Sequence, residues 1–246
     1  MSHLAVNGLV VRAVEYKEAD LILSVITEQE GTLTVTARGA RRRGSPHAAA
    51  SQVLCYSRMV LSEYRDRFTL KEAEILEGFS AMRGSLLSMA LASYLIELAQ
   101  TLAPEGELFR LTLIALANLN ADRRPHKLIK AAFEMRALFC AGFGPETDAC
   151  SRCGDEAPTM LLPALGGRAL CPFCARQRGE DIDAMLPYDT DCRLALRHIR
   201  TAPAEKVFSF TASDKALAKL AALCEFLTLA QTDRVPAALD FYRGLL

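Results

Sequence analysis

Hydrophobic and polar residues alternate along the first eighty positions of the chain, and this alternation predicts β-strands. In residues 32–38, for example, Leu33, Val35 and Ala37 alternate with polar residues, which is the period-2 pattern of a half-buried strand. The same reasoning predicts five strands, at 8–14, 20–27, 32–38, 53–63 and 68–76. Five short strands in so short a stretch favour a small barrel, either an OB-fold or an SH3-like barrel.

From about residue 80 the spacing of apolar residues becomes helical. In 85–103, Leu87, Leu91, Leu95 and Leu98 recur at intervals of three or four residues, as on one face of a helix. Further helices are predicted at 107–120, 127–140, 189–201, 213–231 and 237–246, whereas the polar residues 175–181 are expected to form a loop. Ser213 is a credible N-cap. The chain is therefore expected to be an α+β protein with domains at 1–79 and 80–246.

Two Cys-x-x-Cys pairs lie between the third and fourth predicted helices. Cys150 and Cys153 are separated from Cys171 and Cys174 by 17 residues, a spacing typical of a four-thiolate zinc site. Such a site leaves no open coordination position, so we expect one structural zinc ion per chain, in a hairpin at 148–176. A redox dithiol and four unligated thiols are the alternatives, but a redox dithiol normally appears as a single pair.

The other four cysteines lie among apolar neighbours. They are Cys55, Cys140, Cys192 and Cys224, and each is expected to be a buried small hydrophobe. Eight cysteines without a recognisable secretory signal favour a reducing, cytoplasmic location.

Composition excludes two classes of protein. The 246 residues are 51% apolar and 24% charged, and contain no apolar run near 18 residues, so a membrane-spanning segment is not expected. The 29 basic and 29 acidic residues give a net charge of zero. The chain as a whole is therefore no strongly cationic nucleic-acid binder, and any such role must come from a local patch.

One local patch of that kind follows the third predicted strand. Arg38, Arg41, Arg42 and Arg43 fall within six positions, next to glycines and Pro46 that indicate a loop. Arginine forks in a flexible loop suit phosphate oxygens, although a solvated charged loop fits the residues equally well. The glycine-rich phosphate loop of nucleotide hydrolases is absent.

Several motifs, in their order and spacing, resemble the RecO family of bacterial recombination mediators over nearly the whole chain. They are Gly8-Leu9-Val10-Val11-Arg12, Ala37-Arg38-Gly39-Ala40-Arg41-Arg42, Glu72-Ala73-Glu74, Phe133-Glu134-Met135-Arg136-Ala137-Leu138, the two cysteine pairs, Phe208-Ser209-Phe210 and Leu239-Asp240-Phe241-Tyr242. Each motif is weak alone, but the set is specific.

The resemblance implies an OB-fold at 1–79, followed by a helical domain at 80–246 that carries the zinc hairpin. It implies binding of single- and double-stranded DNA, annealing of complementary strands, and cooperation with RecR and the single-strand-binding protein in loading RecA. It also implies that the chain is not an enzyme, and that it acts at the bacterial nucleoid and not at a membrane.

The resemblance also changes how individual residues are interpreted. Nucleic acid crosses an OB-fold over strands 2 and 3 and between the loops joining strands 1–2 and 4–5. The expected phosphate-binding residues are Arg38, Arg41, Arg42, Arg43, Arg65 and Arg67. Tyr16 and Tyr64 are the best candidates for base stacking.

A second set of residues is nominated for the acidic, apolar tail of the single-strand-binding protein. It consists of Lys127, Lys130, Phe133 and Arg136 on the third helix, with Phe139 nearby. The alternative interpretation is that these cations are ordinary solvated or snorkelling side chains.

Two other functions compete with a DNA-binding mediator. One is a zinc-ribbon regulatory or scaffold protein whose barrel binds protein. The other is a thiol redox enzyme that uses Cys150/Cys153 or Cys171/Cys174.

Overall fold

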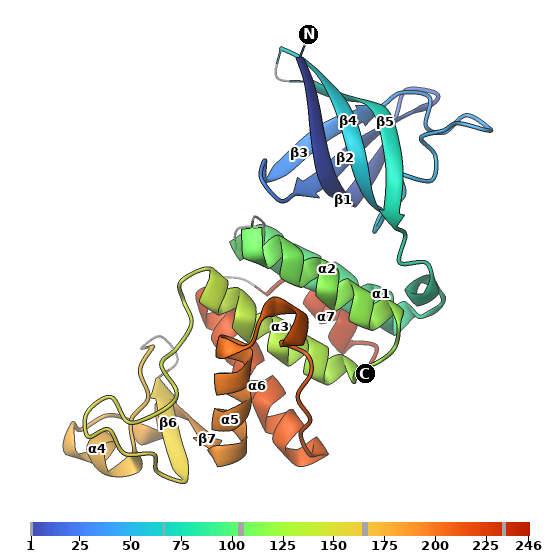
Figure 1. The fold of residues 1–246 in the computed structure, drawn as a ribbon. Coiled ribbons are helices and arrows are strands. Elements are labelled where there is room, and N and C mark those ends of the chain that lie inside the picture. Colours follow the sequence, from blue (N-terminus) through green and yellow to red (C-terminus); the bar gives the residue numbers. More distant parts are fainter. Residues whose placement is uncertain (1, 66, 103–105, 164–166, 233–234) are drawn as a thin grey trace. The chain divides into compact units, whose positions relative to one another are not determined.

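The structure is a computed structural model that describes residues 2–65, 67–102, 106–163, 167–232 and 235–246 (Figure 1). Its contacts divide the chain into two compact units. The first contains the N-terminal strands and the first residues of helix α2, and the second contains the other helices and the cysteine motif. Each unit is described on its own.

The first unit is a closed five-stranded barrel. Its strands are β1 (Ser2–Tyr16), β2 (Asp20–Thr27), β3 (Thr32–Ala37), β4 (Tyr56–Tyr64) and β5 (Arg67–Glu77). Their order around the barrel is β1-β2-β3-β5-β4. All neighbours are antiparallel except β3 and β5, which pair in parallel at Val35↔Phe68 and Thr36↔Thr69. This is the Greek-key arrangement of the OB-fold, so the predicted fold class is confirmed.

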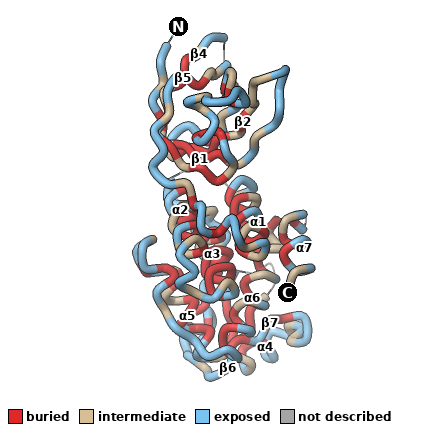
Figure 2. Tube along the Cα trace, turned by 90° about the vertical axis from the view of Figure 1, so that its right-hand side faces the viewer, coloured by how far each residue is buried: buried red, intermediate tan, exposed pale blue. Residues whose placement is uncertain are grey.

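Alternate residues of these strands fill the barrel. Leu23, Val25 and Val35 are fully buried inside it, as the period-2 pattern predicts. Gly8 allows β1 and β2 to come close together, because a Cβ atom at this position would lie 2.4 Å from Val25 Cγ1. In Figure 2 the barrel strands are red where they face this core.

The connection between β3 and β4 is packed against the barrel. Val10 of β1 exchanges two backbone hydrogen bonds with the end of this connection. Its N–H donates to Cys55 O (3.0 Å), and Leu54 N–H donates to Val10 O (2.8 Å). Ala40 and Ala50 are also buried. β4 therefore begins at Tyr56, three residues later than predicted, because Leu54 adopts a positive φ of 66° that interrupts the strand.

The second unit is a helical bundle around α3. Its helices are α1 (Leu86–Leu102), most of α2 (Gly106–Asn120), α3 (His126–Cys140), α5 (Thr190–Thr201), α6 (Asp214–Gln231) and α7 (Ala237–Arg243). Helix α3 packs against α1, α5 and α6 and is buried along most of its length (Figures 1 and 2). These are the predicted helices, with Ser213 as the N-cap of α6, but α7 ends three residues earlier than predicted.

An ionic cluster lies inside this bundle. The ammonium group of Lys130, which is 4% exposed, lies 2.6 Å from a carboxylate oxygen of Glu134 and 2.6 Å from one of Glu225. The hydroxyl of Tyr94 donates to the same Glu134 oxygen at 2.6 Å, and Arg243 pairs with Glu225 at 2.6 Å. Burial raises the pKa of Glu134 to about 7, although the Lys130 charge and its hydrogen bonds oppose the rise.

Some local predictions were wrong or missing. The residues 175–181, predicted as a loop, begin inside a short helix, α4 (Pro172–Gln177). Two strands were not predicted, β6 (Thr159–Pro163) and β7 (Met185–Asp189), which pair antiparallel. The remaining elements are the 3-10 helices η1 (Ala81–Gly84), η2 (Ile182–Ala184) and η3 (Ala204–Lys206).

The isolated cysteines follow their prediction with one exception. Cys55, Cys192 and Cys224 are buried, but Cys140 is exposed because it is the last residue of α3, where the helix leaves the bundle. Within the described residues, none of the helices is both long and apolar enough to cross a membrane.

Candidate nucleic-acid interface and metal centre

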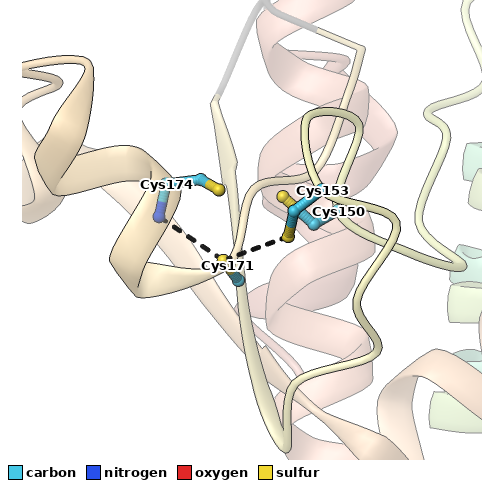
Figure 3. A group of neighbouring side chains, drawn as sticks. All are labelled: Cys150, Cys153, Cys171 and Cys174. Carbon is cyan, nitrogen blue, oxygen red and sulfur yellow. Dashed lines mark hydrogen bonds between the residues drawn. The ribbon is translucent and has the colours of Figure 1, made fainter.

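The two Cys-x-x-Cys pairs come together in space. Cys150 and Cys153 lie on one turn, and Cys171 and Cys174 lie at the start of α4, with all four sulfur atoms within 4.8 Å of one another (Figure 3). The Cys153 and Cys171 sulfurs are 3.9 Å apart, and all four thiols are free. A tetrahedral zinc ion with Zn–S bonds of about 2.3 Å requires sulfur–sulfur separations of about 3.8 Å. The four thiols therefore fit a metal ion and can hold one.

Local backbone geometry aims the sulfurs. Gly154 N–H donates to Cys150 O at 2.8 Å, and the positive φ of 75° at Gly154 closes the first turn. Cys171 is the N-cap of α4, and its sulfur accepts from Cys174 N–H at 3.4 Å. Both turns thus point their sulfurs toward a common centre.

The electrostatics of this centre suit a cation. Burial disfavours the Cys150 thiolate, but the backbone N–H groups of Cys171, Cys153 and Arg152 outweigh burial and lower the Cys150 pKa to about 6. Burial and the neighbouring thiols raise the pKa of Cys174 to about 12. A divalent ion at the centre would offset this mutual repulsion and deprotonate the remaining thiols.

Ion pairs attach the cysteine hairpin to α5. Arg197 and Arg200 both pair with Asp148, which lies two residues before Cys150. These arginines hold the pKa of Asp148 below its usual value, although partial burial raises it. Arg193 donates to Ala157 O at 2.8 Å. A metal ion held by the four thiols would therefore fix a loop that ion pairs and hydrogen bonds also tie to α5 of the helical bundle.

A hollow of about 490 Å³ lies on the barrel between the tips of the β1–β2 and β4–β5 hairpins. Its lining contains three cations, of Lys17, Arg38 and Arg67, against one carboxylate, of Asp20, and both Tyr16 and Tyr64 border it. A second hollow of about 340 Å³ shares Tyr16 and Arg67 and continues over the outer face of β2 and β3. The two hollows lie where an OB-fold receives nucleic acid.

The two hairpin tips have the same local structure. Tyr16 precedes Lys17, Tyr64 precedes Arg65, and both cations have a positive φ, of 54° and 51°. In each pair the cation lies 5.2 Å from the centroid of the preceding ring. Tyr16 and Tyr64 are both exposed, so each tip presents an aromatic face beside a positive charge.

The predicted arginines differ in their surroundings. Arg38 and Arg67 line the first hollow, whereas Arg65 does not line it but lies beside Tyr64, which does. Arg41 instead pairs with Glu15 at 3.0 Å. The following residues, Arg42 and Arg43, are exposed on the loop but line neither hollow. Sequence reasoning missed Lys17, although a cation directly after an aromatic residue at a hairpin tip is a signal that could have found it.

The residues predicted to bind a partner tail lie mostly inside the bundle. Phe133 is fully buried and Lys130 belongs to the ionic cluster. Arg136 donates to Ile199 O at 3.0 Å, at the end of α5. Lys127 is exposed. Only Lys127 is therefore open to a partner without rearrangement of the bundle.

These features define a class: a nucleic-acid-binding OB-fold joined to a helical domain that carries a four-cysteine metal-binding hairpin. The sequence matches two family models, "Recombination protein O N terminal" over residues 1–79 and "Recombination protein O C terminal" over residues 83–237. The chain therefore belongs to the RecO family, whose members act in DNA repair and recombination.

Curated relatives agree with this assignment. The chain is 38% identical over 179 residues to the DNA repair protein RecO of Symbiobacterium thermophilum, an alignment that covers 69% of this chain and 70% of the relative. It is 28% identical to the DNA repair protein RecO of Acetivibrio thermocellus, over 100% of this chain and 98% of the relative. A third relative, from Desulforudis audaxviator, is 38% identical over 71% of each chain.

Proposed function

We propose that this chain is a non-enzymatic recombination mediator that binds single- and double-stranded DNA and anneals complementary strands. With RecR, it helps load RecA onto strands covered by the single-strand-binding protein. The observation that carries this proposal is the hollow between the hairpin tips, where Lys17, Arg38 and Arg67 lie beside the exposed rings of Tyr16 and Tyr64.

The hollow suits a nucleic-acid strand held mainly by its backbone. The guanidinium groups of Arg38 and Arg67 can pair with phosphate oxygens, and the rings of Tyr16 and Tyr64 offer stacking surfaces that tolerate any base. Arg65 would add charge at one tip. Such binding is independent of sequence and weakens steeply with salt, because cations on the protein replace counterions on the strand.

Annealing follows from the same surface without a chemical step. A strand seated in the hollow has part of its phosphate charge neutralised, so a complementary strand approaches against less repulsion. Arg42 and Arg43 are exposed on the β3–β4 loop and are available for the second strand. In this scheme Arg41 has a different task, since its pair with Glu15 ties the loop to β1.

The metal ion in this proposal is one structural zinc ion per chain. The support for it is the closed set of four thiols, which leaves no coordination position for a substrate. By holding the hairpin together, zinc would keep Asp148 in reach of the arginines of α5. The hairpin thus contributes to the fold of the bundle rather than to strand binding.

RecR and the single-strand-binding protein are the proposed protein partners, and the nucleoid is the proposed place of action. An acidic, apolar tail of the latter would need a cation and an apolar hollow on the helical unit. Lys127 and Lys130 line such a hollow, of about 190 Å³, together with Tyr242 and Leu246, and its lining also contains Glu225 and Arg243. Of the four residues nominated for this contact, we carry forward Lys127, because the ammonium group of Lys130 is already paired with Glu134 and Glu225.

Strand annealing tests the proposed function. The unaltered protein should anneal complementary oligonucleotides at low salt, both bare and covered by single-strand-binding protein, whereas Arg38→Ala with Arg67→Ala should be slower at least tenfold. Arg58→Ala is the matched control, because Arg58 is an exposed arginine of the same barrel that pairs with Glu74 at 3.0 Å. An unaltered protein that fails to anneal bare strands contradicts the proposal.

Zinc content distinguishes the mediator from a thiol redox enzyme. About one tightly bound zinc ion per purified chain is incompatible with a free dithiol centre. Titratable free thiols at Cys150 or Cys171 in the native, metal-loaded protein would favour the redox alternative.

A further inference from the structure

The helical unit has an open hollow that takes no part in the proposed function. It measures about 350 Å³ and lies between one face of α5 and the segment that leads into α6. We call it the α5–α6 groove and define it by Asp191, Leu194, Ala195, His198, Phe210 and Ala216. Its volume is at the lower end for ligand pockets, which suits one large side chain better than a whole cofactor.

The groove is apolar in its middle. Leu194 is 54% exposed although it lies on a helix whose other exposed residues are mostly polar. Ala195 and Ala216 are too small to fill the space beside it, and the ring of Phe210 lies against that of His198 with centroids 5.4 Å apart. An apolar side chain placed there would remove Leu194 and its neighbours from water.

Several backbone N–H groups along one side of the groove have no acceptor within the described part of the chain. Residues 209–212 have no regular secondary structure. Among the described residues, the N–H groups of Phe210, Thr211 and Ala212 donate to no protein acceptor. In an extended segment the N–H groups of alternate residues point to the same side, so those of Phe210 and Ala212 are the pair that a β-strand added beside the hollow would engage. Every second side chain of that strand would then be directed into the hollow.

The charges of the groove select the occupant. Asp191 is exposed and is the sole carboxylate in the lining, which contains neither lysine nor arginine. Lys219 is already paired with Asp189 at 2.5 Å, and His198 Nε2 lies 2.9 Å from Lys206 O, so this nitrogen is a donor. The groove therefore repels phosphate and favours a cation at the Asp191 end.

We propose that the α5–α6 groove docks an extended segment of a partner protein. The segment adds a strand along residues 209–212, inserts one leucine or phenylalanine beside Leu194, and places a lysine or arginine two positions away near Asp191. This interaction is separate from strand binding at the barrel, because every residue of the groove belongs to the helical unit.

A panel of synthetic peptides tests the proposal on the full-length, zinc-loaded, ¹⁵N-labelled protein. The first peptide is acetyl-Thr-Lys-Thr-Leu-Thr-Lys-Thr-amide. The second replaces the leucine by alanine, the third replaces both lysines by glutamate, and two more carry N-methyl groups on alternate amides in either register. Amide shifts of Thr211, Ala212 and Ala216 report binding even at millimolar dissociation constants.

We expect saturable shifts with the first peptide, a dissociation constant about tenfold higher with alanine, and at least threefold higher with glutamate. One N-methyl register should abolish binding and the other should leave it, as strand addition requires. Leu194→Asn and Asp191→Asn should weaken binding of the first peptide, while Phe226→Asn, at a 46% exposed aromatic outside the groove, should not.

Three results would overturn the proposal. They are the absence of saturable shifts with every peptide at several millimolar, equal binding of the lysine and glutamate peptides, and equal effects of Leu194→Asn and Phe226→Asn. Self-association of the chain that Leu194→Asn abolishes would also overturn it, because the occupant would then be a second copy.

Discussion

Removing the ammonium group of Lys130 should destabilise the helical unit, and by more than a loss of side-chain packing alone would. Lys130→Met keeps the length and apolar stem of the side chain but leaves Glu134 in the core without its countercharge. The second oxygen of Glu134 already lacks a hydrogen-bond partner within the described residues. Breaking a buried ion pair in this way costs about 3–5 kcal/mol.

The size of the effect can be separated into its parts. Glu134→Gln combined with Lys130→Met removes both charges, so the double variant should lose less than the sum of the two single variants, by about 2 kcal/mol or more. For a chain of this length, 1 kcal/mol corresponds to about 2–4 °C in Tm. Lys130→Met should therefore melt roughly 10 °C below the unaltered protein. Lys127→Met, on the exposed side of α3, should change little.

The pH dependence of the same variant has a definite sign. The pKa of Glu134 in the folded protein is about 7, above the usual 4.5, and it rises further when Lys130 is removed. The folded state then binds the proton more tightly than the unfolded state, so stability is greatest at low pH and falls as pH rises from about 4.5 through the folded pKa. Helical circular dichroism during thermal and urea unfolding at pH 5, 7 and 8 measures this. A loss below 1 kcal/mol at pH 8, or strict additivity of the two substitutions, would refute the reasoning.

Three further predictions concern the hairpin, α5 and the end of α3. Cys171→Ser should lower zinc content and solubility first, and DNA binding only as a consequence; a soluble, normally folded variant that has lost annealing contradicts the structural role of the metal. The hydrogen bond from Lys219 lowers the pKa of Asp189 to about 2, so the stability from this pair is present above about pH 4 and is lost as pH falls toward 2. Asp189→Ala should remove that acid dependence. Because Asp189 is also the N-cap of α5, the substitution should cost about 1 kcal/mol in thermal unfolding. Gly144→Ala would place a Cβ atom 1.9 Å from Phe139 Cδ1, so the ring would have to shift. This shift should cost about 1–3 kcal/mol in urea unfolding. An unchanged unfolding midpoint would mean that the ring moves freely.

Hydrophobic periodicity was sufficient to predict the elements that bury one face in a single core. The bounds of β2, Asp20–Thr27, follow from the sequence because one face of this strand is buried in the barrel and the loops at both ends contain polar residues or glycine. It was insufficient to predict β6 and β7, since each has five residues and includes a proline, and together they form a two-stranded sheet outside the barrel. Likewise, α4 begins at Pro172 because Cys171 caps it, although the last residues of this helix have the composition of a polar loop.

The candidate sites differ in the same way, because one depends on local spacing in the sequence and the other on pairing between distant strands. Ligand spacing alone brought the four cysteines together, because each Cys-x-x-Cys turn is a local structure. The hollow at the barrel instead depends on the parallel pairing of β3 with β5, which places Arg38 and Arg67 around one space although 28 residues separate them in sequence. From the sequence alone, Arg41 could not be distinguished from Arg38, nor Lys130 from an exposed lysine, because their ion pairs and burial depend on tertiary contacts.

The salt dependence of single-strand binding tests the central claim most directly, that the hollow between the hairpin tips holds DNA by its phosphates. The measurement is the slope of log K against log salt for a labelled oligonucleotide, with the unaltered protein, with Arg38→Ala plus Arg67→Ala, and with Arg58→Ala as the control. Each lost phosphate contact on a single strand should reduce the slope by about 0.7, so the double variant should lose about 1.4 and the control nothing. An unchanged affinity and slope in the double variant would place the binding surface elsewhere and contradict the account.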